Sequence, residues 1–309
     1  MQPIISPIDR SVLEAELTKE KFVRDTNNSS NKIYIITHKD SPYLMREIGR
    51  LREETFRNAG GGTGKEIDLD EFDLAEDAPY RQLIVWNPAD RELVGGYRYI
   101  KCGEAPVKNG IVSLATTELF SFNEKFIKEY LPYTIELGRS FVQPKYQPSG
   151  TNRKGLFSLD NIWDGLGAII VDNPDIKYFF GKVTMYTDFN VEARDMILSF
   201  MKLYFPDTED LVIPIHPISL KTDMNSFIAS VKGLAYKEAH HILNQRVREL
   251  GENIPPLVNS YTNISATMKT FGTSMNSHFG DVEETGILVR ISDIYPTKKE
   301  RHINSYKKI

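Results

Sequence analysis

Apolar residues follow two different spacings along the chain, and each spacing predicts its own kind of element. In the segment 41–57, Leu44, Ile48 and Leu51 recur at intervals of three and four, which is typical of the buried stripe of a helix. Ser41 and Pro42 precede this stripe and form a helix start, a capping hydroxyl followed by proline at the first helical position. Short β-prone runs predict strands at 32–38, 82–86 and 93–101.

The second half of the chain alternates between the same two spacings. A stripe from Leu156 to Ile170 predicts a helix, and further segments predict a strand at 176–186, a helix at 191–204, a whole or broken helix at 225–250 and a strand at 285–292. Strands that alternate with helices in this way predict an α/β protein with a mixed sheet. A proline-rich segment after residue 205 predicts a core at 1–205 and an extension at 206–309 that completes the same domain.

The run 133–142 is apolar and β-prone, but it contains Glu136 and Arg139. A buried strand tolerates a charge only where the charge has a partner or a function. Regular alternation would send these two side chains to opposite faces of the sheet. A bulge at Gly138 would turn both of them toward one cleft, as at a catalytic site. The other interpretation is a buried ion pair that fixes the strand register, and we favour the catalytic one because bulges and perturbed charges concentrate at functional sites.

Two further segments carry polar residues in informative places. Arg98 shares its strand face with Val94 and Ile100, so it requires a carboxylate partner or a ligand. The acidic segment 68–73 offers such carboxylates, although a solvated turn has the same composition. The glycine-rich segment 60–65 is not a phosphate-binding loop, because alanine stands at the first glycine of that motif and glutamate follows the lysine.

Composition and charge narrow the class of protein. A net charge of −4 over 309 residues argues against a dedicated nucleic-acid binder. The single cysteine, Cys102, excludes an internal disulfide or a cysteine metal cluster and fits a reducing compartment. Adjacent His240 and His241 cannot face one metal from a helix, so we expect no metal site. Without a signal-peptide pattern or a membrane-spanning run, we expect a cytoplasmic protein, at most peripheral to the inner membrane face, whose basic tail is solvated or touches lipid or an acidic protein.

Four segments taken together resemble a known family. Residues 51–56, 68–73, 93–98 and 136–142 are similar, in this order, to the motif series of the ornithine-lipid and glycine-lipid N-acyltransferases, also called hemolysin-like. These are GNAT-fold enzymes related to the acyl-homoserine-lactone synthases. The resemblance covers roughly residues 40–190. It implies a GNAT fold, with a mixed twisted sheet splayed between two central strands, helices on both faces and a helical C-terminal elaboration.

The resemblance also implies a reaction. A long fatty acyl chain would move from acyl carrier protein to the amino group of an amino acid, glycine or ornithine, with no permanently bound cofactor. The segment 147–156 departs from the donor loop of acetyl-CoA GNAT enzymes, which weakens a coenzyme A donor and suits phosphopantetheine on a carrier protein. Lys145, Arg153 and Lys154 are the candidates for docking an acidic carrier protein, although surface cations usually have no such specific role.

Amide formation requires a neutral amine, a proton acceptor and a donor to the developing oxyanion. We expect Glu136 to accept the proton directly or through one water, and backbone N–H groups near Phe141 and Val142 to polarise the carbonyl. Arg139 is the second catalytic candidate. The candidates for substrate binding are Arg52, Phe56, Asp70, Asp73, Arg98, Phe120, Phe141, Val142 and Trp163.

These candidates fall into two groups, and each group could instead have a purely structural role. The arginines and aspartates are expected to form a buried charge network, which either holds the acceptor carboxylate or only orders the loop at 60–73. The aromatic side chains either line an acyl slot or belong to the plain core. Two other functions compete with the N-acyltransferase, namely a small-acyl enzyme using acetyl-CoA and a non-catalytic module that docks acyl carrier protein.

Overall fold

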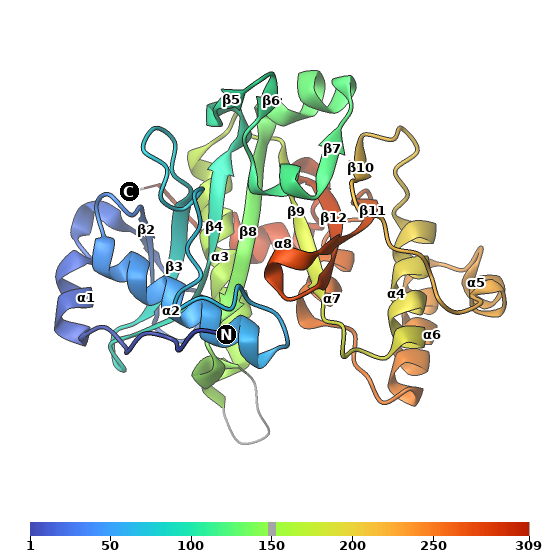
Figure 1. Ribbon diagram of the computed structural model, residues 1–309, viewed down its shortest axis with the longest axis horizontal. Helices are drawn as coiled ribbons and strands as arrows, with labels where there is room; N and C mark the ends of the chain where they lie inside the picture. The colour runs from blue at the N-terminus through green and yellow to red at the C-terminus, as the bar shows by residue number, and fades with distance from the viewer. Residues whose placement is uncertain (148–152, 309) are drawn as a thin grey trace. The chain divides into compact units, whose positions relative to one another are not determined.

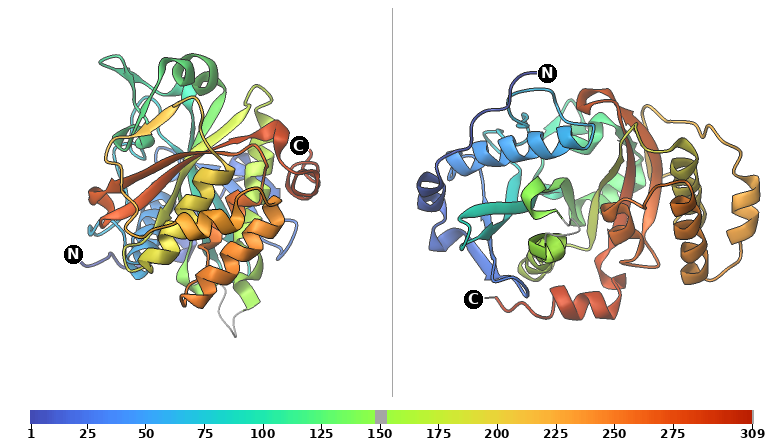
Figure 2. Two further views of the ribbon diagram at one scale, coloured as in Figure 1. Left: turned by 90° about the vertical axis from the view of Figure 1, so that its right-hand side faces the viewer. Right: turned by 90° about the horizontal axis from the view of Figure 1, so that it is seen from below.

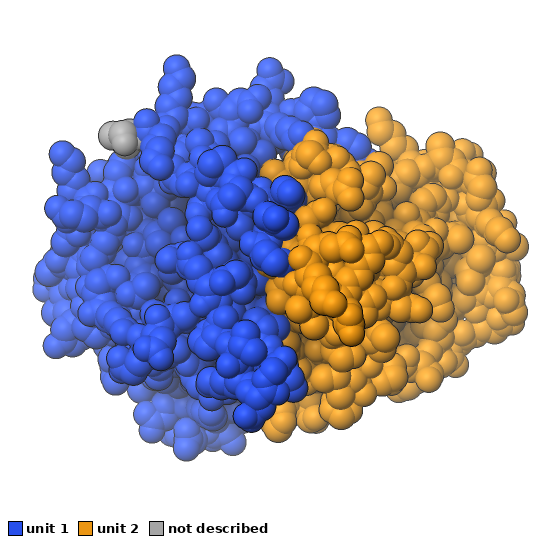
Figure 3. All heavy atoms as spheres, turned by 90° about the horizontal axis from the view of Figure 1, so that it is seen from above, with its two compact units in different colours: residues 1–115, 132–177, 295–309 blue, residues 116–131, 178–294 orange. Residues whose placement is uncertain are grey.

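A computed structural model describes residues 1–147 and 153–308, and the chain forms two compact units (Figures 1 and 3). Unit 1 comprises residues 1–115, 132–177 and 295–309, and unit 2 comprises residues 116–131 and 178–294. The predicted division at residue 205 falls inside unit 2 and stays a prediction. No helix among the described residues has both the length and the apolar character needed to cross a membrane.

Unit 1 is built on five antiparallel strands in the order β1-β2-β3-β4-β8. The strands are β1 (Phe22–Asp25), β2 (Lys32–Ile36), β3 (Arg81–Asn87), β4 (Glu92–Lys101) and β8 (Thr134–Val142), with a small hairpin of β5 (Val107–Lys108) and β6 (Ile111–Val112). The helices are α1 (Arg10–Glu16), α2 (Pro42–Asn58), α3 (Ser158–Asp172) and α8 (Pro296–His302). The helices α2 and α3 cover opposite faces of this sheet (Figure 2), which confirms the prediction of helices on both faces.

Unit 2 contains three antiparallel strands in the order β9-β12-β11, with bounds Tyr178–Met185, Val282–Arg290 and Lys269–Asn276. A short pair joins β7 (Phe120–Phe122) to β10 (Val212–Pro214). The helices are α4 (Val191–Tyr204), α5 (Asn225–Val231), α6 (Tyr236–Glu249) and α7 (Pro256–Thr262). The helix predicted at 225–250 is therefore broken, and the strand β11 was missed because threonine, serine and glycine weaken its apolar alternation.

The start of α2 follows the predicted position but not the predicted cap. Pro42 occupies the first turn as expected, whereas the side chain of Ser41 makes no capping hydrogen bond. The carboxylate of Glu16 instead accepts the N–H groups of Tyr43 at 3.1 Å and Leu44 at 2.7 Å. A carboxylate at this end of a helix satisfies free N–H groups and also interacts favourably with the helix dipole.

The pairing of β4 with β8 contains the predicted irregularity. Gly96 lies opposite Phe141 and Arg98 lies opposite Gly138, so Arg139 and Ser140 together face the single residue Tyr97. This is a β-bulge, and Arg139 adopts the left-handed backbone conformation with a φ of 48°. The bulge predicted at Gly138 is present, but it lies one residue further toward the C-terminus, at Arg139 and Ser140.

Glycines allow β4 to lie close to both neighbouring strands. A Cβ atom on Gly95 would stand 2.3 Å from the carbonyl oxygen of Phe141, and one on Gly96 would stand 2.4 Å from that of Leu83. Real Cβ atoms do not approach a backbone oxygen so closely, so a side chain at either position would push the strands apart.

The basic C-terminal segment binds the helix α3 of its own unit. His302 is buried, and its Nδ1 atom lies 2.8 Å from a carboxylate oxygen of Asp164. The guanidinium of Arg301 pairs with Asp160 at 2.5 Å. Gly167 makes this contact possible, because its missing Cβ atom would stand 1.9 Å from the carbonyl oxygen of His302. The tail is therefore an integral part of unit 1.

Replacing Gly167 by alanine should detach this segment. We expect the free energy of unfolding to fall by about 1–3 kcal/mol, the usual cost of forcing one extra carbon into a packed contact. Chemical denaturation measures this change, and limited proteolysis should then cut the chain near residue 302. The control is Gly103→Ala, whose Cβ atom would stand 3.3 Å from its nearest neighbour. Equal stability and equal protease resistance of G167A and G103A would contradict this role of Gly167.

Candidate active site

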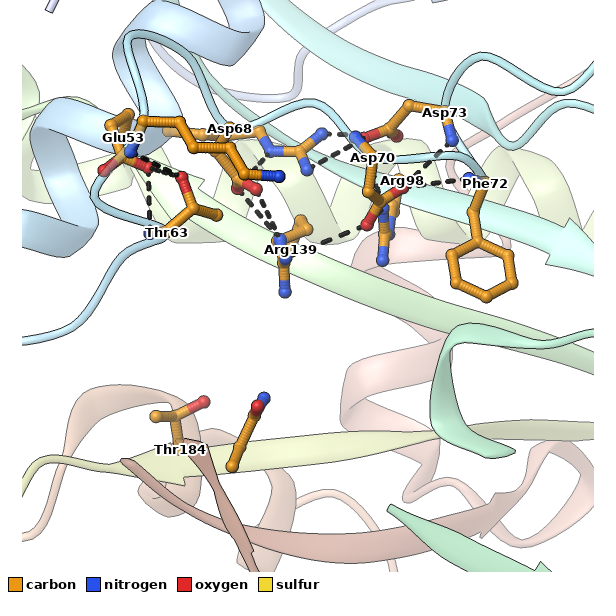
Figure 4. Close-up of polar contacts among 12 residues, drawn as sticks. Glu53, Thr63, Asp68, Asp70, Phe72, Asp73, Arg98, Arg139 and Thr184 are labelled. Atoms are coloured by element: carbon orange, nitrogen blue, oxygen red, sulfur yellow. Dashed lines mark hydrogen bonds and ion pairs between the residues drawn. The ribbon is translucent and has the colours of Figure 1, made fainter. Parts of the chain in front are cut away.

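The centre of unit 1 contains a closed ring of charges in which arginines and aspartates alternate (Figure 4). Its members, in order, are Arg52, Asp68, Arg139, Asp70, Arg98 and Asp73. Five of the six nitrogen–oxygen distances lie between 2.6 and 3.1 Å, and the sixth, between Arg139 and Asp70, is 3.8 Å. The predicted interleaving of the arginines with Asp70 and Asp73 is confirmed, and Asp68 completes the ring.

Four members of this charge ring are almost fully buried, and only two reach solvent. The side chains of Arg139 and Asp70 are 13% and 27% exposed, whereas those of the other four members are at most 3% exposed. Burial opposes the charge on Asp68, but Arg139 and Arg52 outweigh it and lower the pKa of that carboxyl. Burial likewise opposes the charge on Asp70, and Arg98 and Arg139 lower its pKa. Asp68 and Asp70 are thus held in their charged forms by the neighbouring arginines.

The loop at 68–73 is folded around the charge ring. The backbone N–H of Asp68 donates to the carbonyl oxygen of Gly49 on α2 at 2.9 Å. The carboxylate of Asp70 accepts the N–H groups of Phe72 and Asp73, both at 3.1 Å, which closes a turn within the loop. The alternative of a solvated acidic turn is therefore wrong for this segment.

Gln82 on β3 also binds the charge ring, because its side-chain amide donates a hydrogen bond to Asp73 at 2.9 Å. Sequence reasoning did not select Gln82 or Asp68. The available signals were a glutamine next to the apolar run of β3 and a third acid at alternate spacing in the acidic segment. Both signals are weak, because neither indicates which charged residue Gln82 or Asp68 would contact in the folded protein.

The bulge in β8 decides which face Arg139 occupies. Gly138 and Arg98 lie opposite each other, so the side chain of Arg98 and the open side of Gly138 share one face of the sheet. In a regular strand, the residue after Gly138 would point to the other face. The bulge turns Arg139 instead toward Asp68 and Asp70, and Arg98 also binds Asp70. Without the extra residue in β8, the ring would not close.

Glu136 lies on this same face, two residues before Gly138. Its side chain is 1% exposed, and one carboxylate oxygen accepts the hydroxyl of Tyr80 at 2.9 Å. The hydroxyl oxygen of Tyr80 accepts the N–H of Ala115 at 3.0 Å. Burial, followed by the charge of Glu136, raises the pKa of Tyr80 well above its usual value, so the phenol stays protonated. Sequence reasoning missed Tyr80, which precedes β3 without any motif of its own.

The ring of Tyr80 links Glu136 to the charge ring. The guanidinium carbon of Arg98 lies 5.1 Å from the centroid of the Tyr80 ring, a cation–π contact. Nearby Cys102 is no candidate nucleophile, because burial, with the charge of Glu136, raises the pKa of its thiol well above the usual value.

The carboxylate of Glu53 holds the glycine-rich loop at 60–65 in its conformation. Glu53 on α2 is fully buried and accepts the N–H of Thr63 at 3.0 Å, the hydroxyl of Thr63 at 2.7 Å and the N–H of Gly64 at 2.8 Å. Arg57 adds an ion pair to the same carboxylate at 2.6 Å. The N–H groups that would hold a phosphate in a nucleotide-binding loop are thus used by Glu53, in agreement with our rejection of that motif.

The remaining predicted residues lie in several places. Phe56 is buried near the end of α2, Phe141 is buried on β8, and Val142 is half-buried beside it. The ring of Trp163 on α3 stands 6.5 Å from that of His302, so it packs near the C-terminal segment. Phe120 belongs to unit 2, where its ring lies against Gly286. The role of these apolar side chains in an acyl slot stays a prediction.

The three docking candidates are only partly described. Lys145 is 48% exposed and pairs with Glu92 at 2.7 Å. The loop residues 148–152 and the side chains of Arg153 and Lys154 lie outside the described residues. Among the residues that are described, no three side chains of histidine, cysteine, aspartate or glutamate are arranged to hold a metal ion.

Residues 51–154 match the family described as "Acetyltransferase (GNAT) domain". This span includes all members of the charge ring together with Tyr80 and Glu136. The fold class is therefore that of a GNAT acyltransferase, as the resemblance implied. The structure of the acyl-homoserine-lactone synthase LasI is also similar, with 15% identity and a TM-score of 0.36 over 56% of this chain and 79% of that one.

Two curated relatives are similar over the whole chain. The glycine N(alpha)-acyltransferase of Phocaeicola vulgatus is 52% identical over 309 residues, which cover 100% of this chain and 94% of that protein. The protein of the same name from Bacteroides thetaiotaomicron is 52% identical over 307 residues, covering 99% and 91%. The chain belongs to this glycine N(alpha)-acyltransferase family and is an N-acyltransferase, which confirms the predicted enzyme class.

Removing one cation from the charge ring should destabilise the fold strongly. We expect Arg52→Ala to lower the free energy of unfolding by about 3–5 kcal/mol, because Asp68 and Asp73 would lose a partner while remaining buried. Chemical denaturation measures the loss. The control is Arg91→Ala, which breaks an exposed ion pair with Glu14 and should leave stability unchanged within error. A loss for R52A no larger than that for R91A would contradict a structural role of the ring.

Proposed function

We propose that this protein transfers a long-chain fatty acyl group from acyl carrier protein to the amino group of glycine, as the first step in making an amino-acid-containing lipid. The observation that carries the proposal is the 52% identity to two glycine N(alpha)-acyltransferases over essentially the full chain. Ornithine is the other acceptor that the sequence left open, and both relatives are named for glycine instead.

The reaction is an aminolysis of a thioester. The amine nitrogen attacks the thioester carbon, a C–N bond forms, and the C–S bond breaks to release the thiol of phosphopantetheine. One proton leaves the amine and one proton is taken up by the sulfur. In our proposal Glu136 accepts the amine proton, directly or through one water, and returns a proton to the leaving sulfur. Backbone N–H groups near Phe141 and Val142 stabilise the oxyanion.

The surroundings of Glu136 suit a proton acceptor. Tyr80 donates a hydrogen bond to one carboxylate oxygen. The raised pKa of Tyr80 keeps its phenol protonated, so Tyr80 does not act as the proton acceptor. The hydroxyl thereby fixes the orientation of Glu136. Burial of the carboxylate also strengthens its interaction with a bound ammonium group.

The charge ring serves two purposes in this proposal. Its four buried members hold the loop at 68–73 against α2 and β4 and keep the site in shape. Arg139 and Asp70 reach solvent, and we propose that they guide the zwitterionic acceptor toward Glu136.

The proposal also specifies the acyl donor and the cellular location of the enzyme. Carrier protein is favoured by the sequence of the segment 147–156, which lacks the usual coenzyme A pattern, and coenzyme A thioesters remain the alternative. Lys145, with Arg153 and Lys154, would meet the acidic surface of the carrier. Because the product is an amphiphile, we also propose a cytoplasmic location with peripheral contact to the membrane.

The central experiment compares the wild type with Glu136→Gln. Glutamine retains the hydrogen bond to Tyr80 but cannot accept a proton, so we expect the rate to fall by about 100- to 10,000-fold. Purified protein is incubated with glycine or ornithine and with a palmitoyl thioester of either acyl carrier protein or coenzyme A, and mass spectrometry measures the N-acyl amino acid. The same product is sought among the lipids of cells that express each protein.

The control variant is Glu104→Gln at an exposed site, which should retain full activity. N-acylglycine formed from the carrier thioester and lost in E136Q would support the whole proposal. Exclusive acylation of ornithine would overturn the acceptor, and a preference for the coenzyme A thioester would overturn the donor. Full activity of E136Q would remove the assigned role of Glu136.

A further inference from the structure

Arg98 has a buried N–H group that the charge ring does not use. Both of its ion pairs are made by Nη1, at 2.6 Å to Asp70 and 3.1 Å to Asp73. Its Nε atom is buried and has no hydrogen-bond partner among the residues that the structure describes. Burying a guanidinium N–H without an acceptor is costly, so native proteins keep such groups only where they serve a purpose.

The space in front of this N–H group exists because residue 138 is a glycine. A Cβ atom on Gly138 would stand 3.3 Å from Nε of Arg98 and 3.6 Å from its Cγ, with no third heavy atom within 4 Å. Gly138 itself is half-buried rather than buried, so solvent reaches this part of β8. The missing side chain thus leaves an opening toward the unpaired edge of the guanidinium.

The groups around this opening match the two ends of an amino acid. Glu136 lies two residues before Gly138 on the same face of β8, a separation of about 6.6 Å along a strand. Tyr80 bridges the two positions, since its hydroxyl binds Glu136 and its ring lies over Arg98. The guanidinium edge of Arg98 and the carboxylate of Glu136 are therefore close enough to bind the two ends of one small amino acid. Arg139 belongs to the same charge ring.

We propose that the Nε–Nη2 edge of Arg98, over Gly138, binds the carboxylate of the acceptor amino acid. This inference rests on the proposed N-acylation of a free amino acid. A carboxylate makes two parallel hydrogen bonds with such an edge, which fixes its orientation as well as its position. The amino group then points along β8 toward Glu136, where it loses its proton and attacks the thioester.

Electrostatics agrees with a zwitterionic ligand at this position. The charge ring contains three cations and three anions and is neutral by itself. A free carboxylate alone would add uncompensated negative charge beside Asp70, Asp73 and Glu136. A zwitterion adds no net charge, because its ammonium group faces these acids while its carboxylate faces the guanidinium.

The test fills the opening with one methyl group and compares two acceptors. Gly138 does not adopt a left-handed backbone conformation, and its Cβ atom would need only a small shift of the Arg98 side chain, so Gly138→Ala should fold. The two acceptors are glycine and glycinamide, which has the amine but no carboxylate. The control is Gly103→Ala, whose Cβ atom would also meet its nearest neighbour at 3.3 Å, at a site away from the charge ring.

We expect kcat/KM for glycine to fall about 10- to 100-fold in G138A, mainly through KM, which corresponds to the loss of a charge-assisted contact. The value for glycinamide should change less than threefold, and G103A should match the wild type with both acceptors. Thermal unfolding of both variants reports whether the fold is intact.

An equal change for glycine and glycinamide in folded G138A, or no change in either, would overturn the inference. If G138A does not fold, the inference is tested by the preference of the wild type between glycine and glycinamide. The wild type should prefer glycine over glycinamide at least tenfold in kcat/KM, and a ratio near one would overturn the carboxylate site. These outcomes differ from a failure of the proposed function, in which the wild type would not acylate free glycine at all.

Discussion

The alternation of three arginines with three aspartates is the constraint on which unit 1 depends. None of the four innermost members could remain charged alone in the protein interior, because desolvation would cost several kcal/mol for each ion. Each charge is acceptable only when its neighbours on both sides are in place. The ring therefore requires α2, β4, β8 and the loop at 68–73 to be positioned together, and it couples the fold of the loop to the geometry of β8.

One extra residue in β8 makes this arrangement possible. The bulge opposite Tyr97 changes the side to which Arg139 points and leaves Glu136, Gly138 and Arg98 on their common face. The same irregularity thus serves structure and the proposed chemistry. It completes the set of charges and brings the proposed proton acceptor, the candidate carboxylate site and Arg139 together within one part of unit 1. Glycines at 95 and 96 allow the neighbouring strand to follow this bent path at close range.

Much of this arrangement was predictable from local patterns. The apolar stripe identified α2, the interrupted apolar run identified β8, and the glycine between two charges indicated the bulge. Partners distant in sequence were harder to predict, because the pairing of Asp68 with Arg139 or of Tyr80 with Glu136 depends on how a loop and a strand meet in three dimensions. Capping of α2 by Glu16 and docking of His302 on α3 also involve segments far apart in the sequence, for which a single chain carries no signal.

The central claim, that the bulge brings Arg139 into a cooperative charge ring, is tested most directly by a double-mutant cycle. Chemical denaturation gives the free energy of unfolding for the wild type, Arg139→Ala, Asp68→Asn and the double variant. The account predicts a coupling energy of about 1–3 kcal/mol between these two positions, which lie on separate elements of the chain. Additive effects within about 0.5 kcal/mol would mean that the two residues act independently and would contradict the claim.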